Sequence, residues 1–233
     1  MRYINKRVRS EAAELLNDWI NRRRTVGQNL LYDHFDKKKE LNDNLRSEQK
    51  GICCYCQQVI THYHGDNNGG SHNEHLIPEN GEYGRKDLQM DYNNLYASCN
   101  YSKGKCKGDQ HCGEAKHDKL ITEFIQRVDC DKYFKYNVIG EILPSGPYNS
   151  HQEYKEHYDD LTDDQRDAYD TIQTLNLNHE SIKHLRKGDQ KELFKMLGGK
   201  TREQVRANIQ IINTKDQYPR FIDMLLYYMK QKQ

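Results

Sequence analysis

The chain has 233 residues, of which 30% are charged and 17 are tyrosine, while aliphatic side chains are sparse. Its 36 basic and 35 acidic residues leave a formal charge of +1, so net charge neither indicates nor excludes a nucleic-acid partner. No segment is as long and apolar as a membrane helix requires, and the first residues lack the apolar region of a secretory signal. We therefore expect a cytoplasmic protein with no membrane partner, whose seven cysteines are metal ligands or buried thiols rather than disulfides.

Residues 1–48 are predicted to form a helical segment that packs on the segment after it. Ser10 can cap a first helix with an apolar stripe on one face, and Gly27 ends that helix. A second helix is expected after Tyr32–Phe35. No proline- or serine-rich linker follows, so these helices should contact the next segment directly.

The next segment, residues 49–130, is mostly made up of residues 51–119, which have little regular periodicity and many Gly, Asn, His and Cys residues. Six of the seven cysteines fall within residues 51–119. The stretch 62–73 is typical of a loop, and its histidines, His72 among them, are expected to face solvent. Such a segment cannot bury enough apolar surface to order itself, so a bound metal ion is the economical explanation for its order.

The remaining residues divide at a proline-containing breaker. After a short helix expected over residues 120–128, alternating apolar residues predict a β-hairpin that, with the breaker at Pro144 to Pro147, makes up residues 131–147. Residues 148–233 are predicted to be helical. The expected fold class is therefore α+β, mainly α, with a small metal-holding core and a short β-hairpin.

Specific signals place helix boundaries in the C-terminal region. Capping boxes are expected where Thr162 and Thr201 are each followed by glutamine three residues later. Pro219 suits the first turn of a last helix. Charge also separates along the chain: residues 153–170 are mainly acidic, and the basic clusters are Arg22–Arg24, Lys37–Lys39 and Lys103/Lys105/Lys107.

The cysteine spacing predicts a structural zinc site. Cys53 and Cys56 form a C-x-x-C pair, in which two thiolates from one tight turn reach one tetrahedral ion at about 2.3 Å. No second C-x-x-C pair follows, so the other two ligands are either Cys99 with Cys112 or Cys99 with Cys106. We favour Cys112 and leave Cys106 as the alternative.

Between these cysteines stand the residues suited to phosphodiester hydrolysis, which needs a base for water and a cation for the developing charge. His75 can act as a base near neutral pH, and the adjacent Glu74 can hold a hard divalent ion. Neighbours on a strand point to opposite faces, so a bulge or turn is expected here if both are to converge. Asn94 and Lys116 complete the group of candidate residues.

Together these motifs resemble the zinc-knuckled HNH endonucleases of the ββα-metal superfamily. The residues that carry the resemblance are Cys53-x-x-Cys56, Glu74-His75-x-x-Pro78, Asn94-Leu95 and Cys112-x-x-x-Lys116. Flanking stretches resemble the PtuB family, the HNH component of Septu and of certain retron anti-phage systems; these stretches are Met1–Ile4, Gln49–Cys56, Asn94–Asn100, His111–Gly113 and Thr174–Asn178 through Arg186. The similarity covers nearly the whole chain.

The resemblance implies a ββα-metal core in residues 49–130 and a role for each matching residue. His75 would be the general base, and Glu74 would bind the catalytic divalent ion, Mg²⁺ or Mn²⁺. Asn94 would be the middle residue of the HNH triplet, which holds the catalytic loop and orients the histidine. The structural Zn²⁺ would be bound by Cys53, Cys56, Cys99 and Cys112.

The third HNH position departs from the family pattern. These enzymes usually place His or Asn directly after the last knuckle cysteine, whereas Gly113 stands there in this chain and offers no side-chain ligand. The other register supplies Asn100 after Cys99 but has Tyr96 in place of a partner cysteine. The third metal ligand therefore stays open between His111, Asn100 and His117.

The resemblance implies a metal-dependent endonuclease, with DNA as the favoured substrate, that is the effector of an anti-phage defence system. The expected partners are nucleic acid, a PtuA-like ATPase and, in retron systems, the reverse transcriptase with its msDNA. The chain has no G-x-x-x-x-G-K-[ST] loop, so ATP hydrolysis must come from another protein. Two alternatives stay open: an HNH nuclease that cleaves RNA such as tRNA, and a zinc-stapled interaction module without catalysis.

Overall fold

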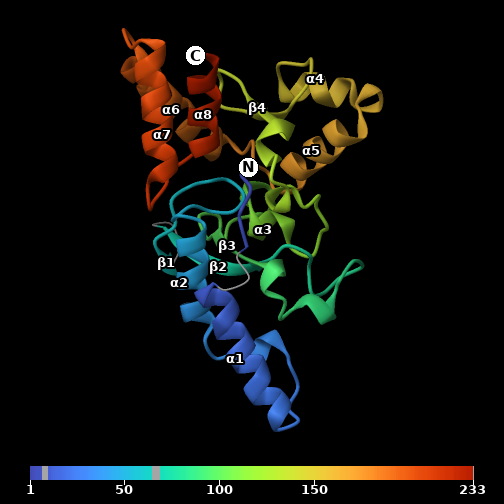
Figure 1. Ribbon diagram of the computed structural model, residues 1–233. Coiled ribbons are helices and arrows are strands. Elements are labelled where there is room, and N and C mark those ends of the chain that lie inside the picture. The colour runs from blue at the N-terminus through green and yellow to red at the C-terminus, as the bar shows by residue number, and fades with distance from the viewer. Residues whose placement is uncertain (7–9, 65–68, 233) are drawn as a thin grey trace.

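Residues 1–6, 10–64 and 69–232 are described by a computed structural model of the chain. They form eight α-helices and two small sheets, so the predicted α+β class is confirmed. The first helix lies at one end of the molecule, the larger sheet in the middle and the C-terminal helices at the other end (Figure 1). Within the described residues, every helix is too short or too polar to cross a membrane.

Two helices precede the larger sheet, as predicted: α1 (Glu11–Thr25) and α2 (Lys38–Glu48). The Ser10 hydroxyl accepts a hydrogen bond from a backbone N–H of the first turn of α1. Leu41 and Leu45 are fully buried on one face of α2. This face packs on the sheet and fixes the position of its strands.

The larger sheet has the strand order β1 (His62–Tyr63), β2 (Gly70–His75) and β3 (Leu95–Cys99), with β1 parallel and β3 antiparallel to β2. The loop predicted over residues 62–73 is therefore wrong at both strand segments, and residues 65–68 lie outside the described part. β2 is polar, and hydrogen bonds satisfy its side chains; Asn73 Nδ2, for example, donates to the carbonyl of Lys38 at 2.9 Å. Because β2 is held by polar contacts, its sequence lacks the alternation of apolar and polar residues from which a strand is predicted.

After β3 the chain makes a series of turns and then forms the short helix α3 (Gly113–Lys116). The helix predicted over residues 120–128 is wrong: these described residues contain a single 3-10 turn, Phe124–Gln126. Ile4 donates its backbone N–H to the carbonyl of Ile125 at 2.8 Å. The Ile125 carbonyl, which would accept a bond within a helix, is thus bonded to the N-terminal segment.

β4 (Phe134–Tyr136) and β5 (Ile142–Pro144) form the predicted hairpin. The side chain of Asn137 closes its turn, because Oδ1 accepts the backbone N–H groups of Ile139 at 3.2 Å and Glu141 at 2.9 Å. Gly140 has a φ of 87°, which a residue with a side chain rarely adopts.

Five helices follow: α4 (His151–Glu156), α5 (Asp163–Thr174), α6 (Glu180–Leu197), α7 (Arg202–Thr214) and α8 (Ile222–Gln231). The capping boxes predicted at Thr162 and Thr201 are both present. The prediction that Pro219 lies in the first turn of the last helix is wrong. Phe221 has a φ of 55° and donates its backbone N–H to the carbonyl of Gln57 at 3.0 Å, so α8 begins only after this contact.

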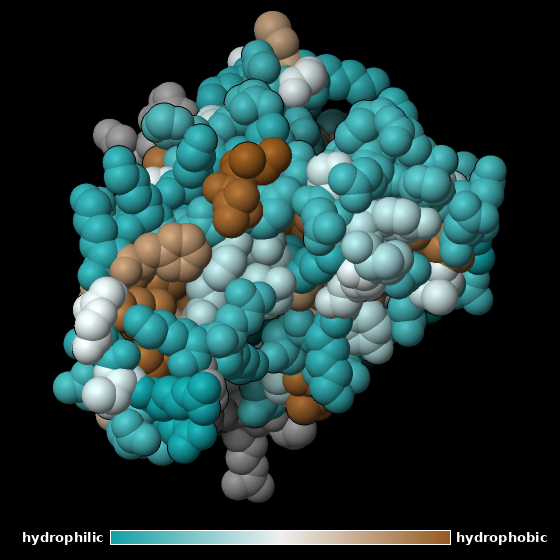
Figure 2. Space-filling view, turned by 90° about the horizontal axis from the view of Figure 1, so that it is seen from above, coloured by the Kyte–Doolittle hydropathy of each residue, from teal (hydrophilic) through white to brown (hydrophobic). Residues whose placement is uncertain are grey.

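One hydrophobic core extends from Met1 to Met229 and includes the buried cysteines of the sheet region. α8 reaches the cysteine-bearing turn directly, because Gln57 Nε2 donates to Asp223 Oδ2 at 2.6 Å. Seen from the end that carries the C-terminal helices, the surface is mainly hydrophilic, with small and separate hydrophobic areas (Figure 2). The cysteine-bearing turn is therefore held between the sheet and the C-terminal helices.

Candidate functional site

The turn that carries Cys53 and Cys56 is anchored to β3 through its backbone. The N–H of Cys54 donates to the carbonyl of Ala97 at 3.1 Å, and the N–H of Gln57 closes the turn on the carbonyl of Cys53 at 3.1 Å. The two thiols of the C-x-x-C pair therefore lie close to the end of β3, where Cys99 stands.

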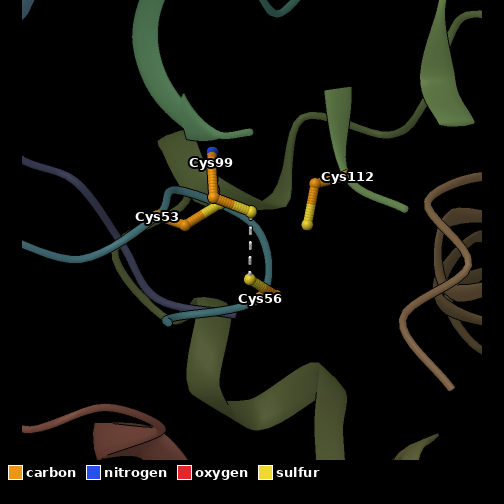
Figure 3. A group of neighbouring side chains, drawn as sticks. All are labelled: Cys53, Cys56, Cys99 and Cys112. Atoms are coloured by element: carbon orange, nitrogen blue, oxygen red, sulfur yellow. Dashed lines mark hydrogen bonds between the residues drawn. The ribbon is translucent and has the colours of Figure 1, made fainter. Parts of the chain in front are cut away.

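Four buried cysteines from three separate segments converge at this point (Figure 3). The sulfur atoms of Cys53, Cys56, Cys99 and Cys112 all lie within 4.8 Å of one another. The Cys56 and Cys99 sulfurs are 3.7 Å apart, and a tetrahedral ion with 2.3 Å metal–sulfur bonds separates its ligands by about 3.8 Å. The donor set thus fits a metal such as zinc, while Cys106 is exposed.

Backbone and side-chain donors surround these sulfurs. The N–H groups of Cys99 and Gln58 point at Cys53 Sγ (3.4 Å) and Cys56 Sγ (3.5 Å). Burial alone would raise the pKa of Cys53, but hydrogen bonds from the neighbouring thiols hold that pKa well below its ordinary value. These contacts favour a thiolate at Cys53, the form that binds metal, whereas contacts within the cluster raise the pKa of Cys99 and, after burial, that of Cys112.

Glu74 lies on β2 beside the cysteine cluster and is almost fully buried. Its Oε1 accepts from the Tyr55 hydroxyl at 3.1 Å and is 3.2 Å from Lys116 Nζ, while its Oε2 is 3.0 Å from His72 Nε2. Burial raises the pKa of Glu74, but the Lys116 charge and the His72 hydrogen bond outweigh it and lower the pKa to about 2. Glu74 is therefore a fixed anion at neutral pH.

His72 belongs to this group, and the expectation that it faces solvent is wrong. Its side chain is 25% exposed, Nε2 faces Glu74 and Nδ1 is 2.6 Å from Asn100 Oδ1. Burial lowers the pKa of His72, yet its contacts with Glu74 leave the pKa above the ordinary value. Residues two apart on a strand share a face, so a correct strand assignment would have paired His72 with Glu74.

His75 follows Glu74 without a bulge, because Glu74 pairs with Tyr96 and His75 with Leu95 in an unbroken ladder. The bulge or turn expected for convergence is therefore not formed, and the His75 ring lies on the other face of β2, edge-on to Tyr32 at 4.7 Å. His75 Nε2 is 2.9 Å from the carbonyl of Gln89 and donates to it, which leaves Nδ1 as the basic nitrogen of the neutral ring.

Glu74 and His75 are nevertheless both among the residues that line one open hollow of about 260 Å³ at the end of β2, together with residues of α3. Lys116 connects the two faces, since its Nζ contacts the Glu74 carboxylate and donates to the carbonyl of His75 at 2.8 Å. Asn94 holds the loop beyond β2: its Oδ1 accepts the N–H of Ile77 at 2.7 Å and its Nδ2 donates to the Ile77 carbonyl at 2.9 Å.

The three contenders for the third ligand lie in different surroundings. His111 faces the cysteine cluster, with Nδ1 3.3 Å from Cys112 Sγ, and burial lowers its pKa to about 4. The His117 side chain lines the hollow but is 80% exposed. Asn100 contacts His72 and so belongs to the group around Glu74.

Comparison with protein-family models gives no match, and a search of curated proteins gives none either. The geometry of the site and the motifs of the sequence therefore carry the functional argument.

Proposed function

We propose that the chain is a metal-dependent endonuclease of the HNH type that hydrolyses phosphodiester bonds, with DNA as the favoured substrate. One observation carries the proposal: Glu74 and His75 both line the same hollow, and their side chains leave the end of β2 on opposite faces. In-line displacement at phosphorus needs the attacking water on one side and the leaving oxygen on the other. Groups on opposite faces of one strand end suit this requirement, so a bulge is not needed.

His75 acts as the general base in this proposal. Its Nε2–H is held by the Gln89 carbonyl, so Nδ1 can take a proton from water. The loop that follows the histidine is held in place by the side-chain contacts of Asn94 with Ile77. These contacts match the bracing role that the HNH resemblance implies for Asn94.

Glu74 holds the divalent ion, Mg²⁺ or Mn²⁺, which supplies charge stabilisation at the leaving oxygen when bound. The carboxylate fits this role because it is ionised, fixed by Tyr55 and Lys116 through Oε1, and borders the hollow. The four cysteines hold a structural Zn²⁺ that joins the C-x-x-C turn, the end of β3 and the start of α3. The ββα order of β2, β3 and α3 is consistent with an HNH core.

Gly113 offers no metal ligand, but this does not by itself favour the alternative of a non-catalytic module. A Cβ atom at this position would lie 2.4 Å from Glu74 Oε2 and 2.5 Å from His72 Nε2. A side chain at this position would therefore displace the ends of Glu74 and His72, so glycine keeps these two side chains where they are.

By the same resemblance, the protein works in anti-phage defence with an ATPase of the PtuA type. The absence of a P-loop motif in the sequence is consistent with this division of labour. Affinity capture of the tagged protein from its host should recover a P-loop ATPase. Full nuclease activity of a preparation that retains no ATPase would argue against the partnership.

The nuclease activity is tested by incubating the zinc-loaded protein with supercoiled plasmid, linear duplex DNA and tRNA, with Mn²⁺, Mg²⁺ or a chelator. We expect nicking and linearisation of the plasmid with a divalent ion and none with the chelator. Cleavage of tRNA but not of DNA would show that the substrate is RNA. Intact substrates in every divalent-ion reaction would contradict it.

A further inference from the structure

We infer that His72 supplies a nitrogen ligand to the divalent ion held by Glu74, in the role that Gly113 cannot fill. This inference rests on the proposed function for the purpose of the ion but concerns binding alone. One metal ligand would thus come from β2 and not from α3, where HNH enzymes usually place it.

The two oxygens of Glu74 have different surroundings. Oε1 is occupied by the Tyr55 hydroxyl at 3.1 Å and by Lys116 Nζ at 3.2 Å, which fix the carboxylate in place. Oε2 has one described contact, with His72 Nε2. Oε2 therefore has lone pairs available for an ion that the imidazole also contacts.

The separation of these two atoms suits a shared ion. Ligands at about 2.1 Å from a divalent ion and at right angles to each other are about 3.0 Å apart. His72 Nε2 and Glu74 Oε2 are 3.0 Å apart. Their positions two residues apart on a regular strand require no rearrangement of the backbone.

Asn100 sets the orientation of the imidazole. Its Oδ1 lies 2.6 Å from His72 Nδ1 and accepts the hydrogen on that nitrogen, which leaves Nε2, the nitrogen that faces Glu74 Oε2, as the atom that can bind the ion. Metal-binding histidines ordinarily donate their second nitrogen in this way. Asn100 is thus a positioning residue, although it stands at the place of an HNH ligand in one register of the sequence.

The bare backbone of Gly113 lies against both ligand atoms, and a Cβ would come within 2.5 Å of each. The glycine therefore makes room for a histidine that arrives from the strand. A nitrogen–oxygen donor pair also favours Mn²⁺ over Mg²⁺, because imidazole suits transition metals and Mg²⁺ prefers oxygen.

The test measures Mn²⁺ binding to the zinc-loaded protein by calorimetry and by electron paramagnetic resonance. We expect one Mn²⁺ site, tighter than the Mg²⁺ site, with a nitrogen hyperfine coupling. His72→Gln should remove this coupling and weaken binding by at least the ~10- to 100-fold that loss of an outer contact costs. Gly113→Ala should weaken Mn²⁺ binding while every ligand is retained. His184→Ala, which removes an exposed histidine of α6 outside the hollow, is the control and should bind as the unaltered protein does.

An unchanged Mn²⁺ affinity and nitrogen coupling in His72→Gln would overturn the inference, provided that the variant keeps its zinc and its circular dichroism spectrum. So would the absence of any Mn²⁺ site, which would leave His72 and Glu74 as a hydrogen-bonded pair only. A protein that binds Mn²⁺ through His72 but cleaves no nucleic acid would sustain this inference and contradict the proposed function. A protein that cleaves nucleic acid but does not bind Mn²⁺ through His72 would contradict this inference alone.

Discussion

Glu74 combines nearly complete burial with three polar partners, and its charge is the reason that they are arranged around it. An isolated carboxylate at this depth would bind a proton, since burial disfavours the charged form. Lys116 and His72 reverse that effect and lower the pKa of Glu74 to about 2. The same contacts that would hold a metal ligand in place therefore also contribute to folding.

The first prediction concerns the pH dependence of this contribution. The pKa of Glu74 is lower in the folded than in the unfolded chain, so its stabilisation is present above about pH 4.5 and is lost as the pH falls toward 2. In the chain without a catalytic ion, Glu74→Gln should lower the free energy of unfolding by roughly 3 kcal/mol at pH 7. The difference should shrink between pH 4.5 and pH 3 in denaturant titrations. A difference that does not vary with pH would show that the Glu74 charge is not stabilised by its neighbours.

At the scale of elements, α6 carries one buried charge, Arg186, which interacts electrostatically with two cysteines of the cluster. Arg186 is 2% exposed, and its guanidinium donates hydrogen bonds to the carbonyls of Leu177 at 2.8 Å and Gly140 at 3.3 Å. Burial lowers the pKa of Arg186, while Tyr136, Cys56 and Cys112 oppose that shift. A zinc ion with four thiolates carries a net charge of −2, so a guanidinium close to it is a natural counter-charge.

The second prediction is that Arg186→Met accelerates zinc loss. Removal of an outer contact of a metal site typically costs about 10- to 100-fold in affinity. Release of zinc to a chromogenic chelator should be faster by a factor in this range. Arg206→Met, on the exposed face of α7, is the control and should leave the release rate unchanged. Equal rates for both variants would refute the counter-charge role.

Elements with a strong local signal could be predicted from the sequence. Ser10, Thr162 and Thr201 cap helices as expected because a cap is a contact between near neighbours. The polar strand β2 was missed because its stability comes from β3 and from hydrogen bonds to α2. The start of α8 was misplaced because Phe221 bonds to a turn far away in the sequence.

The candidate site divides in the same way. The spacing of Cys53 and Cys56 and the Glu74–His75 pair are visible in the sequence, because the chemistry needs those residue types. The part played by His72 was missed, since it depends on a strand register and on the missing side chain of Gly113. Long-range contacts of this kind leave no local pattern.

At the scale of the whole molecule, basic side chains gather near Tyr32 and His64 although the net charge is +1. Lys38 Nζ is 4.9 Å from the centre of the Tyr32 ring, and that ring contacts His75. Burial, and then the charges of Lys103, His72 and Lys38, lower the pKa of His64, so cations from α2 and from the turns after β3 face one region. A phosphate backbone that reaches His75 past Tyr32 would meet Lys38.

The third prediction is that replacing Lys37, Lys38 and Lys39 by alanine weakens DNA binding and reduces its salt dependence. Each lost phosphate contact should lower the slope of log K against log[salt] by about 0.9. Fluorescence anisotropy with the His75→Ala protein as background measures binding without cleavage. Alanine at Lys187, Lys191 and Lys195 of α6, at the other end of the molecule from α1 in Figure 1, is the matched control. Equal salt slopes for the two triple variants would refute a DNA path along α2.

The most direct test of the central claim is the rate of plasmid cleavage by His75→Ala in the presence of Mn²⁺. His184→Ala, on the exposed surface of α6, serves as the control for loss of a histidine. We predict a loss of at least about 100-fold for His75→Ala, which is the scale of general-base catalysis, and no loss for His184→Ala. Cleavage by His75→Ala at the rate of the unaltered protein would contradict the account.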